Sequence, residues 1–505
     1  ISRDQAGKPV PENGAADVSK DMVLSWQPGI YAPAIGGHRL YVSDVFADVN
    51  DGAAVALVGV TSLPEYVPAG LAFGTTYYWR VDEANNVTAW NKGQVWLFTT
   101  EPLAYAVPGS AITASASSRH NDTMAPGKTV DGSGLDAGDL HSASQDDMWL
   151  SGAGDASPWI QYEFDRLYSL HEMWVWNFNQ SFESIVGFGL KDVVIEHSAD
   201  GANWVALAGN VQMPAAAGAP GAAHDIAIDL GGAVARYVRI TAKSNWGGWN
   251  RYGLSEVRFF YVPMAARSPQ PEAGAAGISP VPLLTWRSGR AAASHDVYVG
   301  TDEQSVRAAT QPVATVADAF FEAGPLALAT TYFWRVDEIN RAQTPAVWEG
   351  QVWSFSTSAF LVVDDMESYN DEEGQGTRIY ETWADGWNVA GNGGQVGYLT
   401  VPSVEKTLVH GGKQSMPLLY DNKSEPYSET TRTFDAPHDW TRFGIKTLVL
   451  HFRGDAANTG GKLYVKINGI KATYGGDAGD VARPDWTQWS IDLASLGTNL
   501  QSVTK

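Results

Sequence analysis

Carboxylate pairs are the residues of this sequence whose types and spacing come closest to catalytic chemistry. Asp82 stands beside Glu83, and Asp364 stands beside Asp365. A glycoside hydrolase needs two carboxylates at a defined separation across a cleft. Neighbouring residues on a strand point to opposite faces, so these pairs do not by themselves predict such a site.

Other enzyme signatures are missing as well. The sequence contains no G-x-S-x-G, H-E-x-x-H, P-loop or G-x-G-x-x-G motif. HGGKQS at 410–415 is only faintly similar to an oxyanion loop, because no strand-turn-helix pattern surrounds it. The absence of cysteine excludes disulfides, thiolate zinc sites and thiol catalysis. We therefore predict that this chain is not an enzyme.

A duplicated stretch shows which elements must position any site. Residues 75–85 read TTYYWRVDEAN and residues 330–340 read TTYFWRVDEIN. Their side chains alternate with a period of two, which predicts a half-buried β-strand. Three further segments return in the same order, namely LSW (24–26) as LTW (284–286), HRLYV (38–42) as HDVYV (295–299) and GQVWLFTT (93–100) as GQVWSFST (350–357). A whole domain is duplicated, and not a catalytic cluster.

Composition predicts several all-β domains and excludes some partners. At about 150 residues per domain, 505 residues make roughly three or four domains. Short alternating segments between Gly, Pro, Asn and Asp predict a multi-domain array of β-sandwiches. The net charge of −22 repels phosphate backbones, so we predict no nucleic-acid partner. No run of roughly 18 apolar residues is present, so we predict no membrane span.

The two copies resemble fibronectin type III domains. LAFGTTYYWRV and LALATTYFWRV match the turn-then-strand pattern of that family, with Tyr77 and Tyr332 as the buried corner tyrosine. The resemblance implies domains at residues 8–101 and 264–358 that act mainly as spacers. ISRDQAG resembles the tail of a preceding strand, so we expect residues 1–7 to be a linker or the end of a preceding domain.

The segment between the copies, residues 102–263, resembles a discoidin (factor V/VIII type C) domain. Five blocks carry this resemblance in order, namely ASASS (114–118), SPWIQYEFD (157–165), KDVVIEHSADGANWVAL (191–207), ARYVRIT (235–241) and GLSEVRFF (253–260). The family is a jelly roll grouped with galactose-binding carbohydrate modules. The resemblance therefore implies a second kind of β-sandwich with sugar-binding loops at one end.

The last segment, residues 359–505, is similar to another galactose-binding-like jelly roll. It begins FLVVDDMESYND, and the alternation in LVLHF and LYVKI predicts sandwich strands. In such domains an acidic closing strand matches the first strand, and the sequence shows none before Lys505. We expect this domain to lack its last strand, which leaves room for a strand from another chain. The order of domains resembles modular exported proteins of planctomycete-type bacteria.

The discoidin resemblance also implies a bound calcium ion as a structural cofactor. Hard cations take carboxylate and backbone carbonyl oxygens, and related modules use an A-x5-D-G turn with a late glutamate. The corresponding residues here are Lys128, Asp131, Gly134, Asp136 and Glu256, although an insertion follows Gly132. A solvated acidic turn is the alternative. Asp365 and Glu367 are expected to form half of a similar site in the last domain.

Three loops qualify as a sugar-binding surface by comparison with the family. A sugar site needs an aromatic plate and polar groups on loops at one end of the sandwich. We expect contacts from Arg119, His120, Asn121, Asn177, Asn179, Phe182, Trp246, Trp249, Asn250 and Arg251. Two tryptophans around Gly247 and Gly248 indicate either a stacking surface or a plug that folds into the core.

These observations favour a non-catalytic, extracellular, bacterial glycan-binding or adhesion protein whose partner is a cell-surface or extracellular polysaccharide. Two alternatives stay open. One is a structural surface-layer or filament protein that assembles with other copies of itself, and the other is the binding portion of a larger polysaccharide-degrading enzyme.

Overall fold

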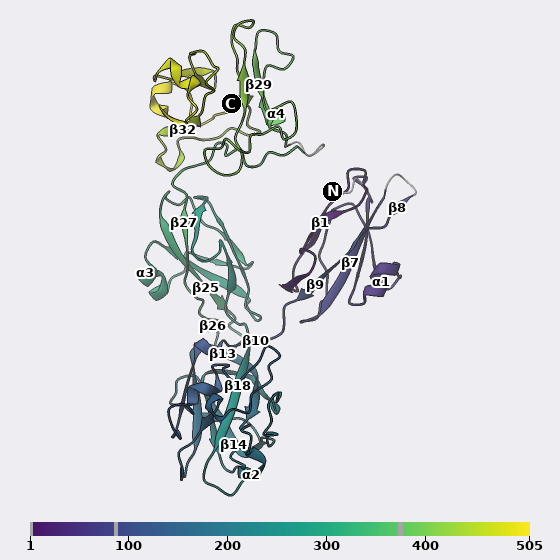
Figure 1. Cartoon of the computed structure of the whole chain (residues 1–505), viewed down its shortest axis with the longest axis vertical. Coiled ribbons are helices and arrows are strands. Elements are labelled where there is room, and N and C mark those ends of the chain that lie inside the picture. Colours follow the sequence, from purple (N-terminus) through teal and green to yellow (C-terminus); the bar gives the residue numbers. More distant parts are fainter. Residues whose placement is uncertain (1–3, 85–88, 372–376) are drawn as a thin grey trace. The chain divides into compact units, whose positions relative to one another are not determined.

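The computed structural model describes residues 4–84, 89–371 and 377–505 (Figure 1). It confirms the all-β prediction, since the longest helices in these ranges, α1 (Phe46–Asp51) and α3 (Glu303–Ala308), have six residues each. The chain divides into two compact units. Unit 1 comprises residues 1–270, 285–321 and 333–353, and unit 2 comprises 271–284, 322–332 and 354–505. Within the described ranges no helix has the length and apolar character needed to cross a membrane.

The first repeat is a sandwich of a three-stranded and a six-stranded sheet. The three-stranded sheet has the order β1-β3-β6, and the other has the order β2-β9-β7-β4-β5 with β8 on β7. Trp26, Trp79, Trp96 and Phe98 form the centre of the core between them. The strands are β1 (Gly7–Val10), β2 (Ala15–Val18), β3 (Leu24–Gln27), β4 (His38–Ser43), β5 (Leu57–Thr61), β6 (Glu65–Tyr66), β7 (Thr76–Ala84), β8 (Trp90–Asn91) and β9 (Val95–Thr100).

The duplicated motif forms β7, and its charged residues hold the sandwich together. Arg80 Nε donates to Asp82 Oδ1 at 2.7 Å, and Arg80 Nη1 donates to the carbonyl of Asn50 in α1 at 2.6 Å. The amide of Gly93 donates to Asp82 Oδ1 at 3.0 Å. The expectation of a half-buried strand is therefore wrong for the second half of β7, where both faces are buried because α1 packs over the polar one. Asn85, the last residue of the motif, lies outside the described residues.

The second repeat has the same strand order and the same buried ion pair. Its sheets are β19-β21-β24 and β20-β27-β25-β22-β23 with β26 on β25. Arg335 Nε lies 3.0 Å from Asp337 Oδ1, and Gly350 donates its amide to the same oxygen at 3.0 Å. The strands are β19 (Arg267–Gln270), β20 (Ala275–Ile278), β21 (Leu283–Arg287), β22 (Ser294–Gly300), β23 (Ala314–Val316), β24 (Phe320–Glu322), β25 (Thr331–Ile339), β26 (Val347–Trp348) and β27 (Trp353–Thr357).

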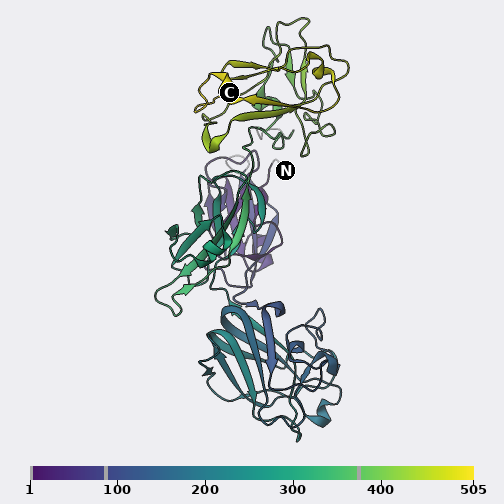
Figure 2. The same cartoon turned by 90° about the vertical axis from the view of Figure 1, so that its left-hand side faces the viewer.

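The discoidin-like module, drawn in blue to teal in Figure 2, follows the first repeat and precedes the second in the sequence. Its nine strands form one hydrogen-bonded network, ordered β10-β18-β13-β17-β14-β15. The two long strands, β13 and β17, pair with each other on both sides of a register shift between Glu163 and Tyr168, so each contributes to two parts of the sandwich. The strands are β10 (Tyr105–Ala106), β11 (Ile112–Ala116), β12 (Trp149–Leu150), β13 (Trp159–Asn177), β14 (Asp192–Ser198), β15 (Val205–Ala206), β16 (Val211–Gln212), β17 (Ile226–Ala242) and β18 (Gly253–Val262).

The described residues of the last domain, 359–371 and 377–505, form four two-stranded sheets, β28-β31, β29-β30, β32-β35 and β33-β34. The predicted strand LVLHF lies in β32, and all of the predicted strand LYVKI except Leu463 lies in β33. Trp489 and Ile491 are at the centre of its larger apolar cluster. The helix α4 (Ile379–Thr382) precedes the strands β28 (Trp383–Ala384), β29 (Gly394–Val396), β30 (Leu418–Tyr420), β31 (Thr431–Arg432), β32 (Thr447–Phe452), β33 (Tyr464–Ile467), β34 (Ile470–Thr473) and β35 (Thr487–Asp492).

Candidate functional site

Backbone hydrogen bonds join the predicted loops at one end of the discoidin-like module. The amide of His120 donates to the carbonyl of Leu150 at 2.7 Å, and that of Ser151 donates to the carbonyl of Tyr252 at 2.8 Å. The amide of Gly154 donates to the carbonyl of Asn250 at 3.0 Å. The loop at 117–123, the loop after β12 and the loop at 243–252 therefore lie side by side.

The loop after β13 joins this group through two glycines. The amide of Gly247 donates to the carbonyl of Gly187 at 2.7 Å. A Cβ on Gly187 would lie 2.4 Å from the amide nitrogen of Gly247, and a Cβ on Gly247 would lie 2.1 Å from the carbonyl oxygen of Val186. Gly187 also has a φ of +59°, which favours glycine. Only glycines let these two loops meet, and their contact places the tryptophan loop beside α2 (Glu183–Val186).

The two loop tryptophans have different environments. Trp249 is 67% exposed, and its indole forms no hydrogen bond with any described residue. Trp246 is 41% exposed, and its Nε1 donates to the carbonyl of Met213 at 3.1 Å. The Lys191 ammonium lies 4.7 Å from the Trp246 ring. Trp249 is therefore a free aromatic plate, whereas Trp246 is an anchored one; neither is a plug in the core.

Polar and apolar residues lie in the same two loops as Trp249. Asn250 is exposed and follows it directly. The Arg251 guanidinium lies 6.0 Å from the ring of Phe188, a residue that sequence reasoning missed. Phe188 stands between Gly187 and Gly189, and this glycine-flanked aromatic was the available signal. Phe182 is 65% exposed and precedes α2, so it lies with Trp246, Trp249, Asn250 and Arg251 in the two loops that the glycines join.

The loop at 117–123 has side chains that are available to a ligand and one that is engaged in the turn. Arg119 Nη2 lies 2.8 Å from Asp122 Oδ1, with both side chains more than half exposed. His120 is exposed. Asn121 instead shapes the loop, since its Oδ1 accepts from the amide of Met124 at 2.9 Å. Arg119 and His120 are thus available to a ligand, whereas Asn121 Oδ1 is engaged in the turn.

Asn177 and Asn179 were predicted as ligand contacts, and the structure corrects this expectation. Asn177 is fully buried, and its Nδ2 donates to the carbonyls of Leu190 at 2.7 Å and Pro214 at 2.6 Å. Asn179 is 1% exposed, and its Nδ2 donates to the carbonyl of Ala219 at 2.7 Å. Both amides tie the loop after β13 to neighbouring loops, because buried polar groups need partners. The two amides therefore stabilise the loops of the site and are not exposed to a ligand.

Asp155 is a second residue that the sequence did not single out. Its carboxylate accepts a hydrogen bond from Ser117 Oγ at 2.6 Å and another from Ser118 Oγ. Burial alone would raise the pKa of Asp155, but the hydrogen bonds from the two serines and from the Ser157 amide lower it. An ionised carboxylate therefore sits in the loop whose Gly154 contacts Asn250. Ser117 and Ser118 are the last two residues of the ASASS block, and the structure shows that they donate hydrogen bonds to this carboxylate.

Glu256 and Asp131 come together from distant parts of the sequence. Glu256 lies in β18, is 4% exposed, and its Oε2 has no hydrogen-bond partner among the described residues. Burial, and next the negative charge of Asp131, raise the pKa of Glu256 to about 8. A buried carboxylate oxygen beside a second carboxylate is unfavourable without a proton or a cation. This pair fits one side of a hard cation site.

Of the other residues predicted for this site, Lys128 lies beside Asp131, whereas the oxygens of Gly134 and Asp136 are engaged elsewhere. Lys128 Nζ lies 3.4 Å from Asp131 Oδ2. Asp136 Oδ1 accepts from the amide of Leu140 at 3.0 Å, and the carbonyl of Gly134 accepts from the amide of Ser142 at 2.8 Å. The insertion after Gly132 thus folds back on itself, and its hydrogen bonds use the Asp136 and Gly134 oxygens.

In the last domain, Glu367 is held by the loop at 410–415. Its Oε1 accepts from the amides of Lys413 at 2.8 Å and Gln414 at 3.1 Å. Asp365 Oδ1 accepts from the amide of Glu367 at 3.0 Å. A Cβ on Gly412 would lie 2.2 Å from Glu367 Oε1, so HGGKQS anchors a carboxylate. In the described part of the chain, no three His, Asp or Glu side chains group closely enough to hold a metal.

Comparison with known proteins identifies the middle of the chain. Residues 111–257 match the model of the F5/8 type C domain. No curated protein matches the chain.

Similar solved structures include three modules from Clostridium perfringens. One is CBM32-3 of a family 31 glycoside hydrolase (21% identity, 31% of this chain and 95% of that chain, TM-score 0.25). The second is the family 32 CBM of NanJ in complex with galactose (15%, 31% and 98%, TM-score 0.24). The third is CBM32-5 of CpGH89 in complex with GalNAc-β-1,3-galactose (16%, 31% and 99%, TM-score 0.24). Residues 111–257 of this chain are an F5/8 type C domain.

Proposed function

We propose that the F5/8 type C domain binds carbohydrate through the loop end that carries Trp249. The exposure of Trp249 is the observation that carries this proposal. A flat apolar ring in water is unfavourable for a folded monomer but suits the C–H face of a sugar. Arg251, Asn250, Arg119 and His120 supply polar groups at the same end. The partner is an extracellular or cell-surface polysaccharide, and the protein is exported from a bacterial cell and not catalytic.

The experiment is a glycan array probed with the full chain, followed by titration of the best glycan. Trp249→Ala should weaken binding at least tenfold, because millimolar affinity corresponds to only about 4 kcal/mol in total and one stacked ring supplies much of it. The melting temperature should stay within about 1 °C, since an exposed side chain contributes little to stability.

The matched control is Trp387→Ala, which removes a 64% exposed tryptophan of unit 2. This variant should bind as the wild type does. Equal affinity for Trp249→Ala and wild type would place the sugar elsewhere or refute carbohydrate binding.

We further propose that calcium binds between Asp131 and Glu256. A calcium ion would supply two positive charges that satisfy the orphaned Glu256 oxygen, and carbonyls of the η2 turn (Pro126–Thr129) would complete the oxygen shell. Its role here is structural, because it would join β18 to the turn before Asp131. The fibronectin-like repeats are proposed as framework.

Self-assembly is a second candidate function, favoured by one edge strand. β5 ends the order of its sheet, and Leu57, Val58 and Val60 are 45%, 41% and 54% exposed. Residues 53–64 carry no charged side chain in a chain of net charge −22. An uncharged, exposed edge is prone to pair with another copy.

Sedimentation of the full chain tests this second candidate. Self-association that Val58→Lys abolishes would support it. A monomer at about 100 μM, where a functional edge contact should populate a dimer, would refute it.

A further inference from the structure

Glu101 follows β9 at the end of the first repeat, and three arginines from residues 267–290 surround it. Its side chain is 2% exposed. Arg290 Nη1 lies 2.6 Å from Glu101 Oε1, Arg287 Nη1 lies 3.6 Å from Oε2, and Arg267 pairs with Oε2 as well. Arg290 also donates to the carbonyl of Pro102 at 2.9 Å. All of these residues belong to unit 1.

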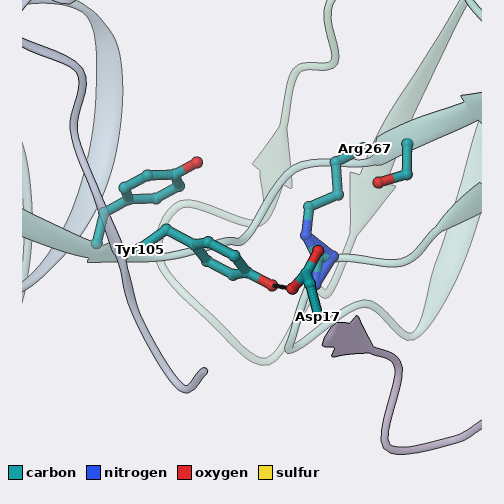
Figure 3. Close-up of a pocket in the computed structure, with 5 residues that line it drawn as sticks. Asp17, Tyr105 and Arg267 are labelled. Carbon is teal, nitrogen blue, oxygen red and sulfur yellow. Dashed lines mark hydrogen bonds between the residues drawn. The ribbon is translucent and has the colours of Figure 1, made fainter. Parts of the chain in front are cut away.

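A second acid, Asp17, joins the same cluster. Its Oδ2 lies 3.1 Å from Arg287 Nη1, and Arg287 Nη2 donates to its backbone carbonyl. Figure 3 shows the Tyr105 hydroxyl pointing at the Asp17 carboxylate, with the Arg267 side chain beside them. A small pocket of about 170 Å³ is lined by Asp17, Tyr105, Tyr261, Arg267 and Ser268. We call Asp17, Glu101, Arg267, Arg287 and Arg290 the arginine clamp.

Comparison of the two repeats shows that the clamp does not belong to the shared fold. Where the first repeat has Glu101, in GQVWLFTTE, the second has Ser358, in GQVWSFSTS. Where the first has Asp17, in ENGAADVS, the second has Gly277, in EAGAAGIS. The acids are thus present in the first repeat alone.

The arginines show the reverse pattern. LSWQPGI of the first repeat corresponds to LTWRSGR of the second, so Gln27 and Ile30 correspond to Arg287 and Arg290. The two copies therefore differ in complementary charges at the positions that meet. The sandwich core does not require these charges, because each repeat folds with the uncharged residue at its own equivalent positions.

We propose that the acidic end of the first repeat is a docking surface whose partner is the arginine face of the second repeat in the same chain. The contact joins the chain segment that precedes residues 102–263 to the segment that follows them. The F5/8 type C domain is then attached to the two repeats at a closed base. This goes beyond the proposed function, in which the repeats are framework only.

The burial of Glu101 makes this contact specific. Arg267 Nη1 and Arg290 Nε are buried and lack a hydrogen-bond partner among the described residues, so the carboxylate is the principal group that balances these cations. Burial alone would raise the pKa of Glu101, but the hydrogen bond and charge of Arg290, and those of Arg267, lower it overall. Removal of one member of a buried, charged set leaves the others unpaired, which is strongly unfavourable.

Distance measurement between two spin labels in the full chain tests the proposal. The chain has no cysteine, so Ala54→Cys in the first repeat and Thr310→Cys in the second give two unique, exposed attachment sites. With the clamp intact, double electron–electron resonance should give one narrow distance distribution. A distribution that is broad already in the parent protein would overturn the proposal.

Variants that exchange residues between the repeats keep each fold intact. Asp17→Gly with Glu101→Ser, or Arg287→Gln with Arg290→Ile, should broaden the distribution at least twofold. Gln27→Arg with Ile30→Arg is the control, because it adds the same charges to the first repeat at positions outside the arginine clamp, and it should leave the distribution narrow. Unchanged distributions in both clamp variants would refute the proposal.

A mixture of singly labelled chains separates docking within a chain from docking between chains. Docking within one chain predicts no defined distance in this mixture. The appearance of the narrow distance there would show that the surface joins two copies, and the proposal for a single chain would be overturned.

Discussion

At the scale of single residues, the site is built by side chains that differ in burial although they are neighbours in sequence. Trp249 and Trp246 are three residues apart, yet only Trp249 is free of anchoring contacts. Glu183 lies in α2, next to the loop that carries them. It is 2% exposed, and its Oε1 accepts from the amide of Gly189 at 2.7 Å.

Glu183 predicts a specific dependence of stability on pH. Burial raises its pKa to about 7, against the opposing hydrogen bond from Gly189. The folded state then holds a proton that the unfolded state has lost between pH 4.5 and 7, so stability falls as pH rises through this window. The loss is on the order of 3 kcal/mol. Glu183→Gln should remove this part of the loss and leave the part that comes from Glu256, a buried acid of the same domain whose pKa is also raised.

Urea unfolding at pH 5 and at pH 8 measures this effect. Asp229→Asn, at an exposed acid of the same domain, is the control and should keep the wild-type dependence. A Glu183→Gln variant that retains the full loss would contradict the assignment.

At the scale of elements, the repeated strand β7 shows how a charged motif becomes a structural one. Arg80 and Asp82 are 4% and 8% exposed in their side chains, and α1 covers them. Buried pairs of this kind are costly to break. The motif recurs because each sandwich needs the same internal ion pair, and not because a reaction is repeated.

Asp82→Asn should destabilise the first repeat by about 3 to 5 kcal/mol, because Arg80 would remain buried without its counter-charge. Urea unfolding followed by tryptophan fluorescence reports this change. Arg236→Gln is the control, since that residue pairs with Glu163 at the surface with both side chains more than 40% exposed. It should cost less than about 1 kcal/mol. Equal effects of the two variants would refute a buried role for the pair.

At the scale of the whole molecule, separate apolar cores predict separate unfolding events. The first repeat, the F5/8 type C domain and the last domain each have their own cluster of buried residues. A ligand that binds one of them adds stability to that domain alone. The proposed calcium site lies in the F5/8 type C domain.

Calorimetry of the full chain should therefore show several transitions, of which calcium raises only one by several degrees relative to chelator. Glu256→Gln should abolish this shift, because it removes the carboxylate that the ion would satisfy. Asp365→Asn, in the last domain, should leave the shift unchanged. The calcium proposal fails if no transition responds to chelator and elemental analysis finds no metal.

The sequence alone determined the β class, the duplication and the F5/8 type C domain. Alternation with a period of two and the ordered motif blocks are local patterns, so they can be recognised without knowledge of the tertiary contacts. The tryptophan loop stands out in the sequence for the same reason, since glycines separate two tryptophans in one short stretch, but the sequence left open whether these tryptophans are exposed or form a plug in the core.

Only the tertiary structure decided which polar residues face solvent. Asn177 and Asn179 are polar loop residues by sequence, but neighbouring loops cover them and take their hydrogen bonds. Asp131 and Glu256 are far apart in the chain, and their effect on one another arises where β18 passes the turn before Asp131. Burial depends on which segment covers which face, and local periodicity carries no information about segments that meet from distant positions.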